Sequence, residues 1–81
     1  MKKTSLIQEL DSVVLTGNLP EYGLECGDIG TVVMVHRGGV GYEVEFVTLE
    51  GKTTAVTSLL SSQIRPIAKG EIAHARMPTA A

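Results

Sequence analysis

Alternating apolar and polar residues give the clearest structural signal in this chain. In the segment YEVEFV, Tyr42, Val44 and Phe46 alternate with Glu43 and Glu45. Successive side chains of a β-strand point to opposite faces, so the three apolar residues face a core and both glutamates face outward. The segment therefore predicts a strand in a sheet that is buried on one side.

Four more segments have the composition of strands. They lie at residues 11–16, 28–36, 53–57 and 64–67, and all contain β-branched residues, which favour an extended backbone. Gly38 and Gly39 supply the backbone freedom for a tight turn after the second strand, and Gly51 does so after the third. Strands joined by such turns predict antiparallel hairpins.

The remaining signals complete an all-β fold. Residues 17–27 contain three glycines and a proline and predict a long ordered loop, whereas 59–63 predicts a single 3₁₀ turn before the last strand. Together these elements predict a small five-stranded SH3-like barrel. We expect an N-terminal extension at residues 1–10, the barrel at 11–67 and a flexible C-terminal tail at 68–81. The predicted core consists of Val13, Leu15, Ile29, Val33, Val44, Phe46, Val56 and Ile64.

The strand at residues 28–36 is apolar on both faces. If Val33 and Val35 fill the barrel, then Val32 and Met34 are left outside, and soluble monomers seldom expose such a strip. We therefore expect an interface with a protein partner or with a second copy. The residues predicted for it are Val32, Met34, Tyr22, Leu24, Glu43 and Glu45. The alternative is that the N-terminal segment, with Leu6, Ile7 and Leu10, covers this strip.

Charge is unevenly distributed along the chain. Residues 4–67 hold eight acids and three bases, a balance of -5, whereas the two ends together carry +3. An acidic domain repels a phosphate backbone, so we do not expect nucleic acid as a partner, although the basic ends leave weak, salt-sensitive binding as an alternative. A single cysteine and the lack of a long apolar run predict a cytoplasmic protein without a membrane partner.

Candidate chemical groups do not combine into a predicted active site. Cys26 stands between the acids Glu25 and Asp28, which disfavour a nucleophilic thiolate, and its spacing from His36 and His74 matches no compact zinc motif. The glycine turn is followed by a strand, not by the helix that a phosphate loop requires. We therefore predict that the protein is not an enzyme and has no catalytic, cofactor-binding or metal-binding residues and no cofactor.

Four blocks of sequence resemble a known family. The blocks at residues 19–24, 27–33, 42–46 and 63–66 are similar to those of a bacterial family of small uncharacterised domains. The Gly-Asp-x-Gly-Thr-Val block, which starts at Gly27, also resembles the opening of SH3-like barrels such as the nitrile hydratase β-subunit. This resemblance implies a barrel fold and a binding or accessory role.

The function expected from these observations is a non-catalytic protein-binding or assembly module that self-associates. Two alternatives stay open. The domain could be an accessory or neutralising subunit of an enzyme or toxin, with its acidic face against a basic surface. It could also be a weak nucleic-acid-binding barrel.

Overall fold

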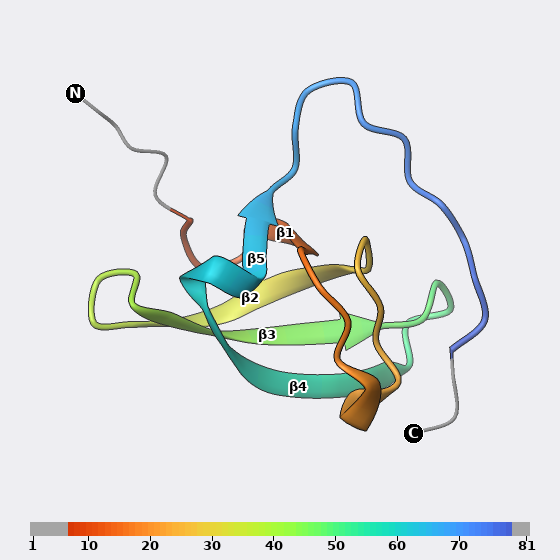
Figure 1. The fold of residues 1–81 in the computed structure, drawn as a ribbon, viewed down its shortest axis with the longest axis horizontal. Coiled ribbons are helices and arrows are strands. Elements are labelled where there is room, and N and C mark those ends of the chain that lie inside the picture. Colours follow the sequence, from red (N-terminus) through yellow and green to blue (C-terminus); the bar gives the residue numbers. More distant parts are fainter. Residues whose placement is uncertain (1–6, 79–81) are drawn as a thin grey trace.

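Five antiparallel strands form one sheet in the computed structural model, which describes residues 7–78 (Figure 1). The strands are β1 (Ser12–Leu15), β2 (Ile29–His36), β3 (Gly41–Val47), β4 (Thr53–Leu60) and β5 (Ile64–Pro66), and their order is β4-β3-β2-β1-β5. Two 3₁₀ turns, η1 (Pro20–Tyr22) and η2 (Ser61–Gln63), lie in the loop after β1 and directly before β5. The predicted all-β class, with five strands and a 3₁₀ turn before the last, is confirmed.

The predicted hairpins are present, and β4 is longer than predicted. Gly38 and Gly39 have positive φ angles in the turn between β2 and β3, and Gly51 has one between β3 and β4. β4 continues to Leu60, which lies opposite Gly41 in the ladder with β3. β5 is an edge strand that ends at Pro66, as expected for a residue without a backbone N–H.

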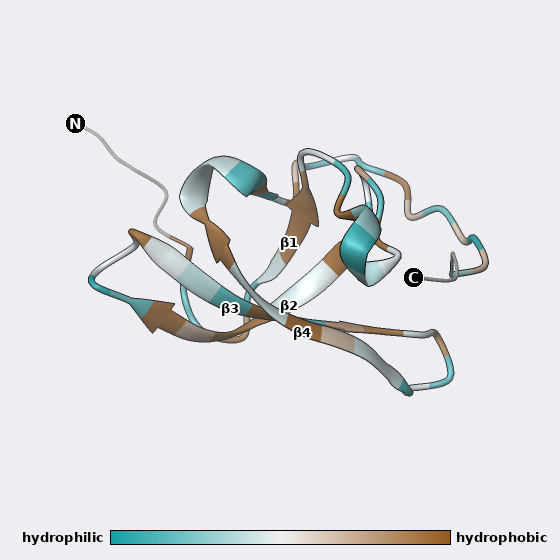
Figure 2. Ribbon diagram, turned by 60° about the horizontal axis from the view of Figure 1, so that its bottom comes forward, coloured by the Kyte–Doolittle hydropathy of each residue, from teal (hydrophilic) through white to brown (hydrophobic). Residues whose placement is uncertain are grey.

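The core lies on one side of the sheet and draws on every strand and the first loop. The buried cluster consists of Val13, Leu15, Leu19, Leu24, Val32, Tyr42, Val44, Phe46, Leu59 and Ile64. Most of β1 is apolar, as its colouring shows (Figure 2). Five residues of the predicted core are therefore confirmed, and the loop residues Leu19 and Leu24 join them. Burial of these aliphatic and aromatic side chains is the main stabilising contribution to the fold.

A β-bulge at Val33 reverses the predicted facing of β2. Val32 pairs with Val44 and Met34 pairs with Glu43, which leaves Val33 without an opposite residue. Val32 is 0% exposed and Val33 is 40% exposed. The prediction that Val33 fills the core and Val32 lies outside is therefore wrong. Because the bulge adds one residue, Val33 and Met34 are both exposed, and Val35 returns to pack against the core.

Gly30 fixes the facing of β2 before the bulge. A Cβ built on Gly30 would lie 2.6 Å from Val44 Cγ1 and 2.7 Å from Phe46 Cε2. Only a residue without a side chain fits here, since real Cβ atoms do not approach other carbons so closely. Gly30 thus faces the core, and Val32, two residues further on, faces it as well.

Two other core predictions are wrong for a related reason. Val56 pairs with the outward Glu45, so it is exposed, while Thr57 and Leu59 face the core. Ile29 pairs with Val14, on the opposite side of β1 from the core residues Val13 and Leu15, and is partly exposed. In both strands the phase differs by one residue from the predicted phase, which moves each side chain to the other face.

The N-terminal end of the described chain lies beside β2. Ile7 packs against the core, and the backbone N–H of Leu10 donates to the carbonyl of Val32 at 2.6 Å. The Leu10 side chain is exposed, and Leu6, which was part of the alternative cover, lies outside the described residues. Within residues 7–78, no helix is long and apolar enough to cross a membrane.

The bulge predicts opposite outcomes for two neighbouring substitutions. Val32→Asp would bury an unpaired carboxylate and should destabilise the domain by about 4 kcal/mol or more, which is most of the stability of a domain this small. Val33→Asp places the same carboxylate in water and should cost less than about 1 kcal/mol. Urea unfolding followed by circular dichroism measures both values. A stable Val32→Asp protein beside an unfolded Val33→Asp protein would contradict the position of the bulge.

Candidate functional site

The loop between β1 and β2, residues 16–28, carries three acidic side chains and is called the acidic loop here. Leu19 and Leu24 form a backbone bridge across it, and both side chains are buried in the core. Asn18 Oδ1 accepts the N–H of Cys26 at 2.8 Å, which ties the two arms of the loop together. Gly23 ends η1 with a φ of 71°, a left-handed conformation that glycine adopts without strain. The loop is thus fixed by its own sequence.

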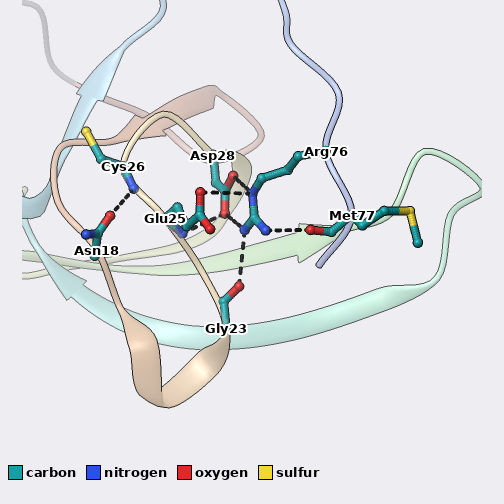
Figure 3. A network of polar contacts seen from close by, with 7 residues as sticks. All are labelled: Asn18, Gly23, Glu25, Cys26, Asp28, Arg76 and Met77. Carbon is teal, nitrogen blue, oxygen red and sulfur yellow. Dashed lines mark hydrogen bonds and ion pairs between the residues drawn. The ribbon is translucent and has the colours of Figure 1, made fainter. Parts of the chain in front are cut away.

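An ion pair joins the acidic loop to the C-terminal segment (Figure 3). Arg76 Nε donates to Asp28 Oδ1 at 2.8 Å, and Nη2 donates both to Asp28 Oδ2 and to the carbonyl of Gly23, the latter at 3.1 Å. Glu25 Oε1 lies 3.8 Å from Arg76 Nε. The guanidinium therefore binds both carboxylate oxygens of Asp28, in the fork geometry that arginine and carboxylate favour.

The environment of Asp28 favours its ionised form. Burial raises the pKa of Asp28. Hydrogen bonds from the Arg76 guanidinium and the Glu25 N–H, together with the positive charge of Arg76, lower the pKa by more than burial raises it. The net result is a pKa below the usual value of an aspartate. The carboxylate is 18% exposed and the Arg76 side chain 24%, so the pair is partly withdrawn from water.

The C-terminal segment, residues 67–78, is held at a second point near its start. Arg65 donates two hydrogen bonds to Glu71, at 2.8 and 2.7 Å, and the N–H of Ala68 donates to the same carboxylate at 2.6 Å. The hydrogen bonds from Arg65 and then from Ala68 lower the pKa of Glu71 to about 2. Between the two ion pairs the segment arches away from β5 before it returns to the acidic loop (Figure 1).

An open pocket lies beneath this arch. Its volume is about 320 Å³, and its lining consists of Val14, Gly27, Ile29, Arg65, Ile67, Glu71, Ile72, Ala73 and His74. Val14 and Ile29 belong to the side of β1 and β2 that faces away from the core. The side chains of the lining are mainly apolar, and its two facing charges, Arg65 and Glu71, neutralise each other.

The outward side of the β2-β3-β4 hairpins carries a second group of polar residues. Glu43 accepts a hydrogen bond from Ser58 Oγ, and its Oε2 lies 2.8 Å from His36 Nε2. The hydrogen bond from Ser58 lowers the pKa of Glu43 most, and the hydrogen bond with His36 lowers it as well. Glu45 accepts a hydrogen bond from Thr53 Oγ1 at 2.8 Å. Both glutamates are thus ladder residues with partners on the neighbouring strands.

β4 forms one edge of the sheet, and within residues 7–78 it pairs with β3 alone. Its sequence, TTAVTSLL, contains no charged residue and no proline. A register shift near Thr54 interrupts its start, and from Ala55 to Leu60 the strand pairs one to one with β3. Exposed edges usually carry lysine, proline or inward-pointing charges that prevent pairing with another chain. β4 therefore leaves a regular and unprotected edge over these residues.

The structure does not bring the six predicted interface residues together. Val32 and Leu24 are buried in the core, so their assignment to an exposed interface is wrong. The reasons are the facing of β2 and the inward packing of the loop. Met34 is 48% exposed and pairs with Glu43 on the outward side, where Glu45 also lies. Tyr22 is exposed on η1, in the acidic loop.

Sequence reasoning missed the ion pair between Asp28 and Arg76. These residues are far apart in the chain, and no periodic pattern connects charges at such a distance. The uncharged composition of β4 was visible in the sequence, but its place at the edge depends on the strand order. Among residues 7–78, no three His, Cys, Asp or Glu side chains gather closely enough to hold a metal ion. Cys26 is exposed.

Arg76→Gln should raise the pKa of Asp28. Without the guanidinium, burial becomes the dominant influence and favours the protonated acid. In the wild type the stabilisation from Asp28 is complete above the ordinary aspartate pKa and is lost as pH falls through the lowered one. An NMR titration of the side-chain carboxyl group measures the shift. Arg37→Gln, which removes the same charge from the turn after β2, is the control and should leave the Asp28 titration unchanged.

The chain matches a model of a protein family. Residues 9–66, more than half of the chain, match the family described as a domain of unknown function (DUF4926). Neither a curated protein nor a solved structure matches the chain. The predicted relation to a family of uncharacterised domains is thus confirmed, and the match includes the acidic loop and all five strands. The chain belongs to the DUF4926 family.

Proposed function

We propose that this domain is a non-catalytic protein-binding and assembly module that self-associates by pairing β4 with β4 of a second copy. The observation that carries the proposal is the unprotected edge of β4 between Ala55 and Leu60. A strand that pairs on one side presents a row of backbone N–H and C=O groups on the other. A second copy of the same strand satisfies these groups in the antiparallel orientation.

Two-fold symmetry makes this pairing self-consistent. In an isologous antiparallel contact, residue i of one copy meets residue j of the other and j meets i, so a charge close to the axis would lie near the same charge of the second copy. β4 has no charge, and the contact is therefore free of this repulsion. Val56 and Leu60 are exposed on the outward side of the strand. Joining two β4 strands brings the Val56 and Leu60 side chains of both copies onto one continuous face, where they lose contact with water.

We also propose that the domain is an SH3-like barrel. The strand order β4-β3-β2-β1-β5 and the 3₁₀ turn η2 before β5 support this assignment. We also propose a bacterial, cytoplasmic setting, which the sequence resemblance and the exposed unpaired thiol of Cys26 support. Fold alone does not determine function, and the feature that supports binding is the edge strand β4.

Sedimentation equilibrium at tens of micromolar tests the self-association. The wild type should form a dimer, and Val56→Lys should shift it toward monomer by placing two ammonium groups near the symmetry axis. Val33→Lys is the matched control, since Val33 is also an exposed valine but lies on β2, away from the edge. It should associate as the wild type does.

Two results would contradict the proposed interface. A monomeric wild type would reject self-association altogether. A dimer that resists Val56→Lys and dissociates with Val33→Lys or Met34→Glu would move the interface from the edge of β4 to the outward side of β2. Circular dichroism of each variant confirms that a loss of association does not reflect unfolding.

A second candidate function is an accessory or neutralising subunit that covers a basic surface of an enzyme or toxin. The observation that favours it is the binding of a guanidinium by the acidic loop. The charge of the domain agrees with this candidate and disfavours nucleic-acid binding. A gel-shift assay at low salt checks the latter expectation, for which no retardation is the expected result.

A further inference from the structure

Arg76 is the main anchor of the C-terminal segment. Among residues 67–78 it is the only residue that is not exposed, and Ile72 is 92% exposed. The other attachment is the ion pair of Glu71 with Arg65, which is more exposed than the pair of Arg76 with Asp28. The segment therefore contributes little more than one guanidinium group to its contact with the acidic loop.

The two sides of this contact lie in different parts of the chain. Gly23, Glu25 and Asp28 are within residues 9–66, the region that matches the family, whereas Arg76 lies ten residues beyond its end. The acceptors are thus part of the domain itself. The arginine that donates to these acceptors comes from the segment that follows the matched region.

From these observations we propose that the second half of the acidic loop, residues 23–28, is a recognition site for an arginine in an extended segment of a partner protein. In the present structure the chain's own Arg76 occupies this site as an intramolecular ligand. The inference goes beyond the proposed self-association, because it uses no residue of β4. It gives a chemical basis to the second candidate function, on which it depends for its biological role.

The geometry of the site is specific for arginine. The two oxygens of Asp28 accept from Nε and Nη2 of one guanidinium, and Nη2 also reaches the Gly23 carbonyl. A lysine ammonium is a single point charge and cannot bond both carboxylate oxygens in this planar arrangement while also reaching the carbonyl. The loop holds its acceptors in place through the Leu19–Leu24 bridge and the hydrogen bond from the Glu25 N–H to Asp28 at 2.8 Å.

Charge complementarity identifies the kind of partner. Residues 9–66 contain eight acids and three bases, so the domain carries -5. Such a field attracts a basic segment and accelerates its encounter with the domain. A partner protein with an arginine on an exposed, extended basic segment fits both the charge of the domain and the geometry of the loop.

The test uses the full chain with Arg76→Gln, which empties the site. The probe is a synthetic peptide with the sequence of residues 68–78, titrated to millimolar concentration while the amide signals of the acidic loop are followed by NMR. We expect the variant to bind this peptide about tenfold or more tightly than the wild type, whose own Arg76 competes at high effective concentration. Saturable shifts at the amides of Gly23, Glu25 and Asp28 would place the peptide in the loop.

Two matched controls define the chemistry. A peptide with lysine in place of arginine should bind Arg76→Gln about tenfold more weakly, because one bidentate contact is lost. Asp28→Asn in the Arg76→Gln background should reduce binding of the arginine peptide to a similar extent, with circular dichroism as the check on folding. Equal binding of the arginine and lysine peptides, or no binding to Arg76→Gln, would overturn the proposal.

The source of the arginine is tested separately. If Arg76→Gln abolishes the association of the full chain in sedimentation equilibrium, the occupant is the tail of a second copy, and the assignment to a partner protein is overturned. If the association is unchanged, the site is independent of the β4 edge. Binding of the arginine peptide by a variant that remains monomeric would support the recognition site even where the proposed self-association fails.

Discussion

The close approach of Gly30 to Val44 and Phe46 is the constraint on which the rest of the sheet depends. β2 pairs with β1 through its first residues and with β3 over most of its length, so it connects the two halves of the sheet. With no side chain at Gly30, the backbone of β2 lies against the core residues of β3. The bulge at Val33 then bends the strand locally and shifts its register against β3 by one residue.

The bulge also explains how a strand with apolar residues on both faces fits into this sheet. A regular strand with that composition would leave an unfavourable apolar strip in water. The bulge instead allows Val32 and Val35 to reach one core, although they are three positions apart. Val33 and Met34 remain exposed at the bulge, as does Ile29 at the start of the strand.

Predictions from the sequence were correct where a local pattern or a residue type is compatible with only one structure. The alternation through Phe46 gave the facing of β3, Gly38 and Gly39 gave the turn, and Pro66 gave the end of an edge strand. It failed where the facing depends on pairing with a distant strand, as for Val56, and where one inserted residue shifts the phase, as for Val33. A period of two carries no information about which of two apolar faces is inside.

The candidate site shows the same division. Acidic residues in the first loop could be read from the sequence, but their arginine partner could not, because that contact exists only after the chain has folded. The loop that binds this arginine also contains the only cysteine of the protein, Cys26, whose thiol is exposed while its backbone N–H is fixed by Asn18. A fluorophore attached there would report from within the loop, so the wild-type sequence already contains a single labelling position beside its candidate binding site.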